Sequence, residues 1–470
     1  MTIRTEVPSF PRRPVIMRVP LGGVRPGTAA LFAVNLAAAA FFLLSYSSHG
    51  IGVGPYRIDL DVYRIGSQVW LHGGDLYGLL PRTASGAQLP FSYPPFAAVV
   101  LSPLTLLPMK AASILGTLAA IALTGLVLGI FLRSAGMPRR RAVAWLLPAA
   151  LLLEPVRNTL NYGQVNVALM ALVAADCLTR SPRCPRGALT GIAAAVKLTP
   201  AAFVLFFLLR RDWRAALTAA ASFAACTGAG FLLAGRDSAE YWTSVLFQSG
   251  RPGSPSYAAN QSILGVIARA GLDPHSPAGT ALWLTLSAAV VVAACRGMRR
   301  ALAASRHAWA LSLNAFAALL ICPISWSHHW VWGEAAVLTL AVGCRRRDRL
   351  RLAAVAVGAV VFAAAPQWWF PGGGNLELHW AAWAQVLGNS YVIYAAAILT
   401  GAALWGTVSN FPDSPPSDGI PEITSPAWQA CWPTRLGRAG FPTSAVPAAG
   451  GCSCRWPSWS PPRVRPPGWR

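Results

Sequence analysis

Long apolar runs alternate with short polar segments along most of this chain. The clearest runs are 28–46, 111–132, 215–234, 280–295, 352–365 and 382–405. Several of them reach the roughly 20 residues that a helix needs to cross a hydrocarbon core about 30 Å thick. The pattern predicts an all-α protein, a polytopic bundle of about 10–12 membrane-spanning helices.

The pattern changes at both ends of the chain. A basic leader occupies 1–27, and we expect it to stay in the cytoplasm without cleavage as a signal peptide. From about Ser409 the sequence is rich in Pro, Ser, Gly and Arg and has no apolar periodicity. We therefore expect a membrane domain over 28–405, with its first extracytoplasmic loop at 47–93, and a disordered cytoplasmic tail over 406–470.

Composition agrees with a membrane protein. Of the 470 residues, 54% are hydrophobic and 12% are charged, whereas soluble domains are about a quarter charged. The formal net charge of +23 lies in short clusters between apolar runs. These clusters are typical of cytoplasmic loops beside anionic lipid, so we expect a bilayer as partner and no nucleic acid.

The basic clusters also orient the chain. They occur in the leader and at 139–141, 180–186, 210–214, 296–306 and 345–351. With all of them inside, the segment 188–209 has basic residues at both ends and must form a hairpin that turns near Lys197. The polar loops without such clusters then share the outer side with Asp59, which predicts a site on that face.

Asp59 and Asp61 fall in the loop between the first two predicted spans. A carboxylate at a bilayer surface is suited to act as a general base, because partial desolvation raises its pKa. The alternative is a solvated loop or a helix cap. Since the two residues are two apart, their side chains point in different directions and only one is expected to face a pocket.

Lys197 is one of only two lysines in the chain, the other being Lys110. It is flanked by apolar residues, and a cation within a membrane segment is expected to meet an anion. A lipid-linked phosphate is the favoured partner, whereas the alternative is a side chain that extends to the outer headgroups.

The remaining polar candidates have structural alternatives. Tyr93 fits an aromatic belt but lies close to the Asp59 loop, and Gln164 and Asn166 either bond other helices or bind a hydroxyl-rich ligand. His328 and His329 are adjacent and therefore do not form a chelating pair, although one of them can donate to a phosphate. The cysteine spacing supports neither a zinc site nor a disulfide framework.

The motifs together resemble glycosyltransferase family 87, whose members are polyprenol-phosphate-mannose-dependent α-(1→2)-mannosyltransferases with a GT-C membrane fold. The matching motifs, in family order, are DLDVY at 59–63, GGDLY at 73–77, PFSYPPF at 90–96, GQVN at 163–166, KLTP at 197–200, NQS at 260–262 and SWSHH at 325–329. The family aspartate matches Asp59, which leaves Asp61 at a variable position.

The resemblance implies an inverting transfer in which Asp59 removes a proton from an acceptor hydroxyl, with Asp61 as the other candidate for this catalytic role. Lys197, His328 and His329 would bind the donor phosphate. The candidate sugar- or acceptor-binding residues are Tyr63, Tyr93, Asn161, Gln164, Asn166, Asn260, Gln261 and Trp326. The implied partners are a polyprenyl-phosphate-linked sugar and a glycolipid or glycan acceptor, at the extracytoplasmic face of the plasma membrane.

The sequence leaves two points open. No cofactor and no metal site are predicted, yet Asp59 and Asp61 have the D-x-D form, so dependence on a divalent metal is open. A multi-helix transporter or flippase for lipid-linked sugars is the alternative function, because transporters also bury cations among helices. The absence of an internal repeat favours the enzyme.

Overall fold

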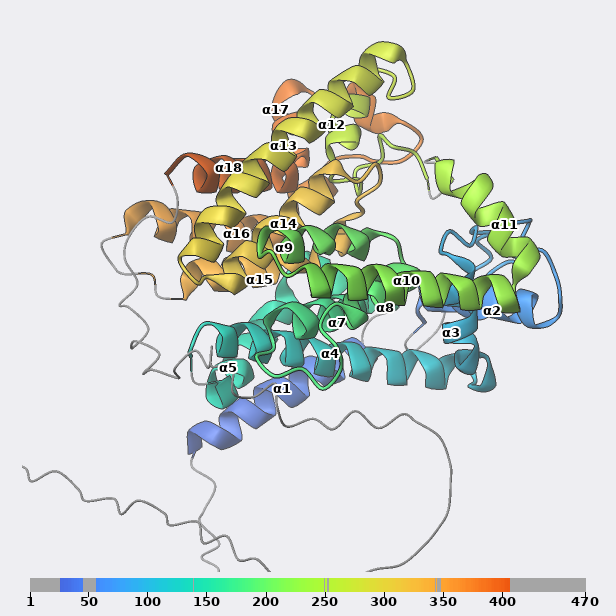
Figure 1. Cartoon of the computed structure of the whole chain (residues 1–470), viewed down its shortest axis with the longest axis horizontal. Coiled ribbons are helices and arrows are strands. Elements are labelled where there is room, and N and C mark those ends of the chain that lie inside the picture. Colours follow the sequence, from blue (N-terminus) through green and yellow to red (C-terminus); the bar gives the residue numbers. More distant parts are fainter. Residues whose placement is uncertain are drawn as a thin grey trace, which may run out of the picture. The chain divides into compact units, whose positions relative to one another are not determined.

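The computed structural model describes residues 26–44 and 56–405, apart from 138, 249, 252, 343 and 345–347. Within these residues every regular element is helical, and strand-like pairing is limited to one bridge between Asn260 and Trp326. The expected all-α class is therefore confirmed (Figure 1). The tail over 406–470, nearly all of the leader and part of the first loop lie outside the described residues.

The helices follow one another without intervening sheets. The α-helices are α1 (Pro26–Leu44), α2 (Ile58–Leu71), α3 (Pro95–Leu101), α4 (Met109–Ser134), α5 (Arg139–Leu152), α6 (Glu154–Tyr162), α7 (Asn166–Leu178), α8 (Ala188–Val196), α9 (Val204–Leu209), α10 (Trp213–Leu233), α11 (Gly235–Thr243), α12 (Ile263–Arg269), α13 (Pro277–Ala303), α14 (His307–Ile321), α15 (Trp332–Ala341), α16 (Arg349–Ala364), α17 (Ala382–Gly388) and α18 (Ser390–Trp405). The 3-10 helices are η1 (Ser102–Leu106), η2 (Thr199–Phe203), η3 (Val245–Phe247), η4 (Ser327–Val331), η5 (Pro366–Trp368) and η6 (Leu376–His379).

Among the described residues, four stretches are long and apolar enough to cross a membrane. They are α4, α10, α13 and the stretch Arg349–Trp368, and the pair α17–α18, bent by 67°, is a fifth candidate. The chain is therefore a multi-pass membrane protein. The expected 10–12 spans are reached only if shorter apolar helices of 10–17 residues, such as α7 and α14, are counted with the long ones.

Residues 95–134 are divided into α3, η1 and α4. The division falls at Leu107 and Pro108, where the backbone of Leu107 is extended (ψ 141°). A residue before proline disfavours the helical conformation, so the helix ends there and α4 begins anew after Pro108.

The hairpin expected over 188–209 is present. Helix α8 ends where the backbone of Lys197 becomes extended, and η2 and α9 run back from that turn. Arg186, before α8, and Arg210, after α9, both donate to the carbonyl of Cys177, at 3.3 and 3.4 Å. The two ends of the segment therefore meet at one place, with Lys197 at the far end.

Small residues allow α8 and α10 to pack closely. A Cβ atom added at Gly187 or Gly191 would lie 1.9 Å from the carbonyl oxygen of Ala215 or 2.3 Å from that of Ala219. Such contacts between small residues are typical of membrane helices. Helix α10 thus packs against α8, α8 packs against α7, and α7 packs against α4 (Figure 1).

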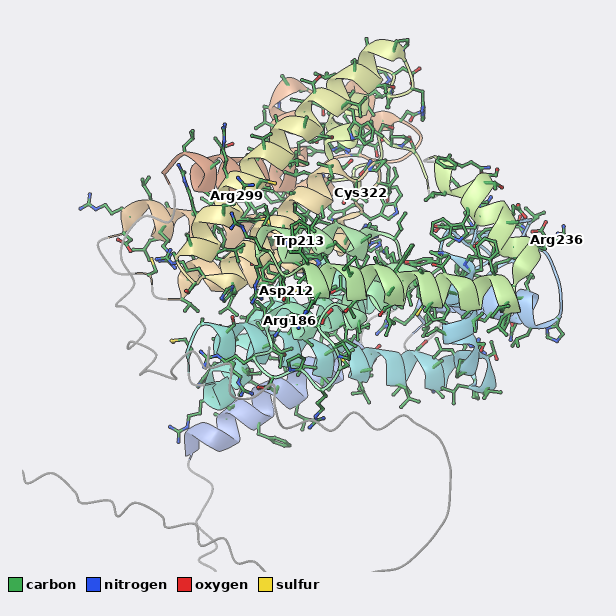
Figure 2. The ribbon with its side chains drawn as sticks, in the orientation of Figure 1. Arg186, Asp212, Trp213, Arg236, Arg299 and Cys322 are labelled. Atoms are coloured by element: carbon green, nitrogen blue, oxygen red, sulfur yellow. The ribbon has the colours of Figure 1, made fainter. Side chains whose placement is uncertain are left out.

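Helix α10 has a clear start signal. The side chain of Asp212 accepts a hydrogen bond from the backbone N–H of Ala215, at 3.1 Å, and so caps the helix that begins at Trp213 (both labelled in Figure 2). This cap satisfies one of the four backbone N–H groups that a helix leaves unpaired at its start.

Arginines cap the ends of several helices. Arg186 (Figure 2) donates to the carbonyl of Thr179 after α7, Arg351 to those of Leu340 and Val342 at the end of α15, and Arg300 to those of Ala402 and Ala403 in the last turn of α18. These carbonyls have no partner within their own helices, and a positive charge is favourable at a helix C-terminus. Arginines of the basic clusters thus also donate hydrogen bonds to the unpaired carbonyls at these helix C-termini.

The polar motifs lie at the opposite ends of the same helices. Asn166 begins α7, the 3-10 helix η4 leads into α15, and Tyr391 lies in the first turn of α18. The basic clusters and the polar motifs are therefore separated by the length of these helices.

Candidate active site

Helix α2 carries both aspartates of the D-x-D motif. Asp59 and Asp61 lie in its first turn, where acidic side chains interact favourably with the helix dipole. The loop predicted between the first two spans thus contains a helix, and the two aspartates do not lie in irregular backbone. The helix forms because 58–71 has an amphipathic pattern and its inner face packs against α3, α4 and α6.

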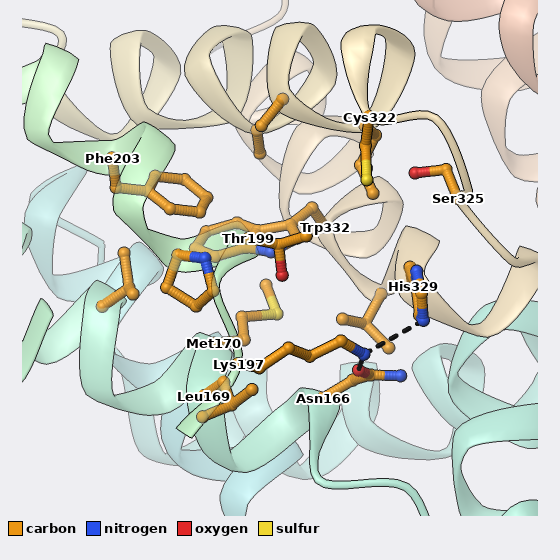
Figure 3. Close-up of a pocket in the computed structure, with 16 residues that line it drawn as sticks. Asn166, Leu169, Met170, Lys197, Thr199, Phe203, Cys322, Ser325, His329 and Trp332 are labelled. Atoms are coloured by element: carbon orange, nitrogen blue, oxygen red, sulfur yellow. Dashed lines mark hydrogen bonds between the residues drawn. The ribbon is translucent and has the colours of Figure 1, made fainter. Parts of the chain in front are cut away.

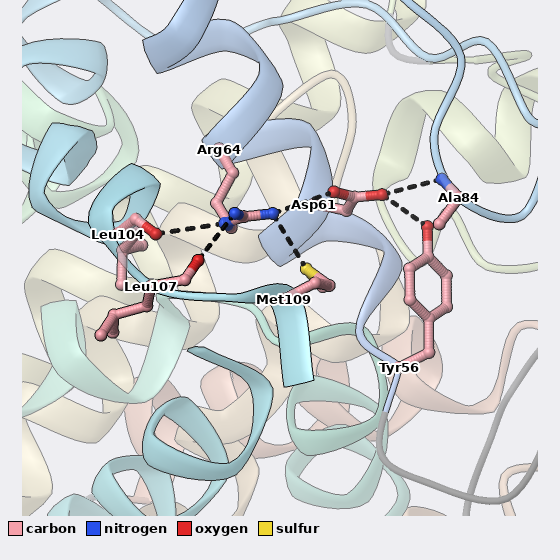
Figure 4. Close-up of polar contacts among 7 residues, drawn as sticks. All are labelled: Tyr56, Asp61, Arg64, Ala84, Leu104, Leu107 and Met109. Atoms are coloured by element: carbon pink, nitrogen blue, oxygen red, sulfur yellow. Dashed lines mark hydrogen bonds and ion pairs between the residues drawn. The ribbon is translucent and has the colours of Figure 1, made fainter. Parts of the chain in front are cut away.

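Asp61 has a structural role and binds residues on both sides of it in the sequence (Figure 4). Its carboxylate accepts hydrogen bonds from the Tyr56 hydroxyl, at 3.0 Å, and from the Ala84 backbone N–H, at 2.9 Å. It also forms an ion pair with Arg64, at 3.7 Å. Asp61 therefore ties the segment that follows α2 to the start of that helix.

Asp59 points to a different partner. The side-chain amide of Gln164 donates to Oδ2 of Asp59 over 2.5 Å. The amide oxygen of Gln164 in turn accepts hydrogen bonds from the hydroxyls of Tyr63, at 2.7 Å, and Tyr93, at 3.0 Å. Both polar atoms of the Gln164 side chain are thus engaged, and Gln164 orients the carboxylate of Asp59.

Gly163 brings Gln164 to this place. Its backbone is left-handed (φ 73°, ψ 37°), which ends α6 and which glycine adopts without steric cost. A Cβ atom at Gly163 would lie 2.7 Å from Cβ of Arg57 and 2.8 Å from Cβ of Leu60. Only a residue without a side chain lets α2 approach α6 so closely.

The surroundings of Asp59 change its acidity. Burial raises the pKa of Asp59 to about 6, while the hydrogen bond from Gln164 and the charge of Lys197 act in the opposite direction. A carboxyl with a pKa near 6 is a stronger base than an ordinary aspartate and is still ionised at pH 7. Such a group is suited to accept a proton from a hydroxyl.

Lys197 lies at the other end of the same hydrogen-bonded chain. Its ammonium donates to Oδ1 of Asn166, at 2.9 Å, and to Nε2 of His329, at 3.0 Å (Figure 3). It also lies 3.4 Å from the Tyr93 hydroxyl and 5.2 Å from the centre of that ring. Tyr93 and Gln164 therefore connect the cation of Lys197 to the carboxylate of Asp59.

The two adjacent histidines have different roles. His329 lines the cavity beside Lys197, and burial together with that positive charge lowers its pKa well below the usual value. Its ring is therefore neutral, and Nε2 accepts from Lys197. The backbone carbonyl of His328 accepts hydrogen bonds from Thr159 and Asn166, both at 2.9 Å, so His328 anchors the turn.

A partly open cavity of about 50 Å³ lies beside Lys197 (Figure 3). Its polar end is formed by Lys197, Asn166, His329 and Ser325. The other lining residues are mostly apolar and come from α7, η2, α14 and the η4–α15 region, namely Leu169, Met170, Val173, Pro200, Phe203, Ala315, Ala318, Leu319, Val331 and Trp332. A lining of this chemistry, polar at one end and mostly apolar elsewhere, suits contact with a molecule that joins an anionic group to a hydrocarbon chain.

Some of the predicted sugar-binding residues are structural instead. Asn260 and Gln261 are fully buried, and their amides donate to backbone carbonyls that include those of Pro323 and Gly388. Enclosed in this way, these two amides are not available as sugar contacts. Asn161 and Tyr63 are also buried, whereas Trp326 is partly exposed beside the site.

Glu154 also lies beside the site, although it was not among the residues predicted from the sequence. It is buried at the start of α6 and accepts a hydrogen bond from Ser327, next to the histidines. The available signal was an acid and a proline after an apolar run in a chain with only 16 acidic residues.

The described residues contain no group of three or more His, Cys, Asp and Glu side chains placed to hold a metal ion. Asp59 and Asp61 have the D-x-D spacing but engage different partners, Gln164 and Tyr56. The two carboxylates therefore do not form a shared site.

Comparison with known sequences gives a consistent set of relatives. The model of glycosyltransferase family 87 matches residues 91–323. A polyprenol-phosphate-mannose-dependent alpha-(1-2)-phosphatidylinositol mannoside mannosyltransferase of Mycobacterium tuberculosis is 40% identical over 86% of this chain and 97% of the relative. The protein of the same description from Mycolicibacterium smegmatis is 39% identical over 74% of this chain and 84% of its own.

A more distant relative and a solved structure are also similar. A phosphatidylinositol pentamannoside mannosyltransferase of Mycolicibacterium smegmatis is 36% identical over 59% of this chain and 68% of its own. The crystal structure of ArnT from Cupriavidus metallidurans bound to undecaprenyl phosphate aligns with 80% of this chain and 77% of its own, with 14% identity and a TM-score of 0.33.

Proposed function

The chain belongs to glycosyltransferase family 87, and on this premise we propose that it transfers a mannosyl residue from a polyprenyl phosphate to a hydroxyl of a phosphatidylinositol mannoside. The observation that carries the proposal is the continuous hydrogen-bonded path from Asp59 through Gln164 and Tyr93 to Lys197. It puts a base and a cation at the two ends of one small polar site.

Asp59 is the general base of the proposed reaction. It takes the proton of the acceptor hydroxyl while the hydroxyl oxygen forms a bond to the anomeric carbon of a β-linked mannosyl phosphate. The bond from that carbon to the phosphate oxygen breaks, and polyprenyl phosphate leaves with the electron pair. Attack opposite the leaving group inverts the configuration and gives an α-linkage.

Lys197 stabilises the leaving group. The donor is a phosphodiester with one negative charge, and cleavage produces a phosphate monoester with a second one. An ammonium that is already fixed by Asn166 and His329 needs little reorganisation to meet this charge. His329 takes part as a neutral ring whose Nε2 holds the ammonium.

The apolar cavity supports a lipid-borne donor. Its lining is mostly apolar away from Lys197, which favours a prenyl chain packed beside α7, η2 and α14 with its phosphate at the ammonium. A nucleotide-sugar donor would need a phosphate-binding loop, which the motifs of this chain do not include. We therefore propose that the donor enters from the bilayer.

We further propose that the reaction takes place at the outer face of the plasma membrane. The basic clusters lie at the helix ends opposite the site, and clusters of this kind remain in the cytoplasm. This orientation gives the acceptor glycolipid access to Asp59 from the outer leaflet.

The proposal is tested with the purified protein in lipid vesicles. A synthetic polyprenyl β-mannosyl phosphate is supplied with phosphatidylinositol mannosides that differ in the number of mannosyl residues. We expect one added hexose that an α-(1→2)-specific mannosidase removes, and no product with the Asp59→Asn variant. Turnover of GDP-mannose in place of the lipid donor, or full activity of Asp59→Asn, would contradict the proposal.

A further inference from the structure

Glu154 is the most extensively hydrogen-bonded carboxylate near the proposed site. It is 1% exposed, at the first position of α6. Its Oε1 accepts from Asn158, at 2.6 Å, and from Ser327 and the Trp368 indole, both at 2.7 Å; its Oε2 accepts from the Tyr391 hydroxyl, at 2.8 Å. One side chain thus joins α6, η4, η5 and α18.

The four side chains that donate to Glu154 are held together by its carboxylate, which is their shared acceptor. Burial raises the pKa of Glu154, and the hydrogen bonds from Ser327, Trp368 and Tyr391 lower it. Hydrogen bonds to an ionised carboxylate are roughly twice as strong as neutral ones. Removal of the acceptor would leave several buried donors without a partner, at a cost of about 1–3 kcal/mol for each.

The turn at η4 is fixed from two sides. Ser327 is bonded to Glu154, and the carbonyl of the next residue, His328, accepts from Thr159 and Asn166. Thr159 and Glu154 both belong to α6. Helix α6 therefore sets the position of the backbone just before His329, whose ring is bonded to Lys197.

We propose that Glu154 is a positioning residue, which holds the η4 turn so that His329 keeps the Lys197 ammonium in place for the donor phosphate. The proposal rests on the proposed function and adds to it a residue that touches neither substrate. Glu154 acts through Ser327, His328 and His329, and its role is geometric.

Two substitutions at Glu154 separate geometry from direct chemistry. In Glu154→Gln the amide oxygen can replace Oε1 and keep its three donors, and the Tyr391 hydroxyl can rotate to accept from the amide nitrogen. We expect this variant to keep kcat/KM within about threefold of the wild type. Glu154→Leu has no acceptor, and we expect its kcat to fall at least tenfold.

The tyrosine that binds Glu154 has a matched control in the same helix. Tyr391 donates to Glu154, whereas Tyr394, one turn later, donates to the carbonyl of Ala354. Both are buried. We expect Tyr391→Phe to lower kcat several-fold and Tyr394→Phe to leave kcat within twofold, although both lose one hydrogen bond.

The experiment measures kcat and donor KM in vesicles, per folded molecule, with the melting temperature of each variant beside them. Ser327→Ala is combined with Glu154→Leu, and we expect the double variant to lose no more kcat than Glu154→Leu alone, since both act on one contact. An inactive Glu154→Gln would assign Glu154 to the chemistry. A Glu154→Leu variant with a lower melting temperature but normal kcat would reduce it to a structural role. If the wild type transfers no mannose, the proposed function itself fails.

Discussion

The side-chain amide of Gln164 donates to the carboxylate of Asp59 over 2.5 Å, between residues 105 positions apart in sequence. The same amide group accepts from Tyr63 and Tyr93, so it cannot rotate without breaking two further hydrogen bonds. The orientation of the proposed base is thus fixed by the connection between α6 and α7.

Asp59 and Asp61 should respond differently to the same substitution. We expect Asp59→Asn to lower kcat by at least 10²-fold, because general-base catalysis contributes about 10²–10⁴-fold. Asp61→Asn should keep kcat within about threefold but lower the melting temperature, since Asp61 holds Tyr56 and Ala84. Equal losses of kcat in the two variants would remove the distinction between the aspartates.

The pH dependence of kcat/KM should report the acidity of Asp59. With its pKa at about 6, the base is protonated at lower pH, and kcat/KM should fall about tenfold per pH unit below that value. In Gln164→Glu a second carboxyl adjoins Asp59. Repulsion between like charges should then raise the pH below which kcat/KM falls. If kcat/KM fell at the same pH in this variant as in the wild type, Asp59 would not control the acidic side of the pH profile.

We expect Asp59 to lower the free energy of unfolding at neutral pH. Its pKa in the folded state, about 6, is above the usual 3.8, so its contribution is favourable only while it is protonated and is lost as the pH rises through 6. We expect Asp59→Asn to raise the free energy of unfolding at pH 7 by up to about 3 kcal/mol. This gain in the free energy of unfolding should vanish near pH 4. If Asp59→Asn melted at a lower temperature than the wild type at pH 7, the result would contradict the burial of Asp59.

Lys197 and Lys110 offer a comparison between the two lysines of the chain. Lys197 is bonded to Asn166 and His329, whereas Lys110 is exposed at the start of α4. We expect Lys197→Met to lower kcat/KM for the lipid donor by on the order of 10²-fold, because it removes a preorganised positive charge. Lys110→Met should have no effect in the same vesicle assay. Activity of Lys197→Met equal to that of Lys110→Met would exclude the phosphate role.

Gly163 can be tested against a glycine of similar backbone conformation. Gly163 and Gly136 have φ values of 73° and 71°. Alanine at either position pays the cost of the left-handed conformation, roughly 1–2 kcal/mol, but a Cβ at Gly163 also meets Arg57 and Leu60, whereas nothing lies within 4 Å at Gly136. We therefore expect Gly163→Ala, but not Gly136→Ala, to lose most of its kcat through displacement of Gln164 from Asp59. Similar activities of the two variants would argue against this tight approach.

The sequence by itself was sufficient for the membrane class and for the main motifs. The apolar runs have the length of membrane helices, and the basic clusters at the ends of 188–209 predicted the hairpin that the bonds of Arg186 and Arg210 to Cys177 confirm. These features are encoded locally, because hydrocarbon length and charge placement act on each segment separately. The motifs likewise indicated Asp59 and Lys197 as candidates.

Only the tertiary structure decided how the candidates are used. Asp59 and Asp61 look equivalent in sequence, yet their partners, Gln164 and Tyr56, come from different parts of the chain. Asn260 and Gln261 looked like ligand contacts, but packing encloses them completely, and Glu154 was missed because its donors come from four separate elements. Hydrogen bonds between residues far apart in sequence depend on which helices meet, and no local pattern specifies that.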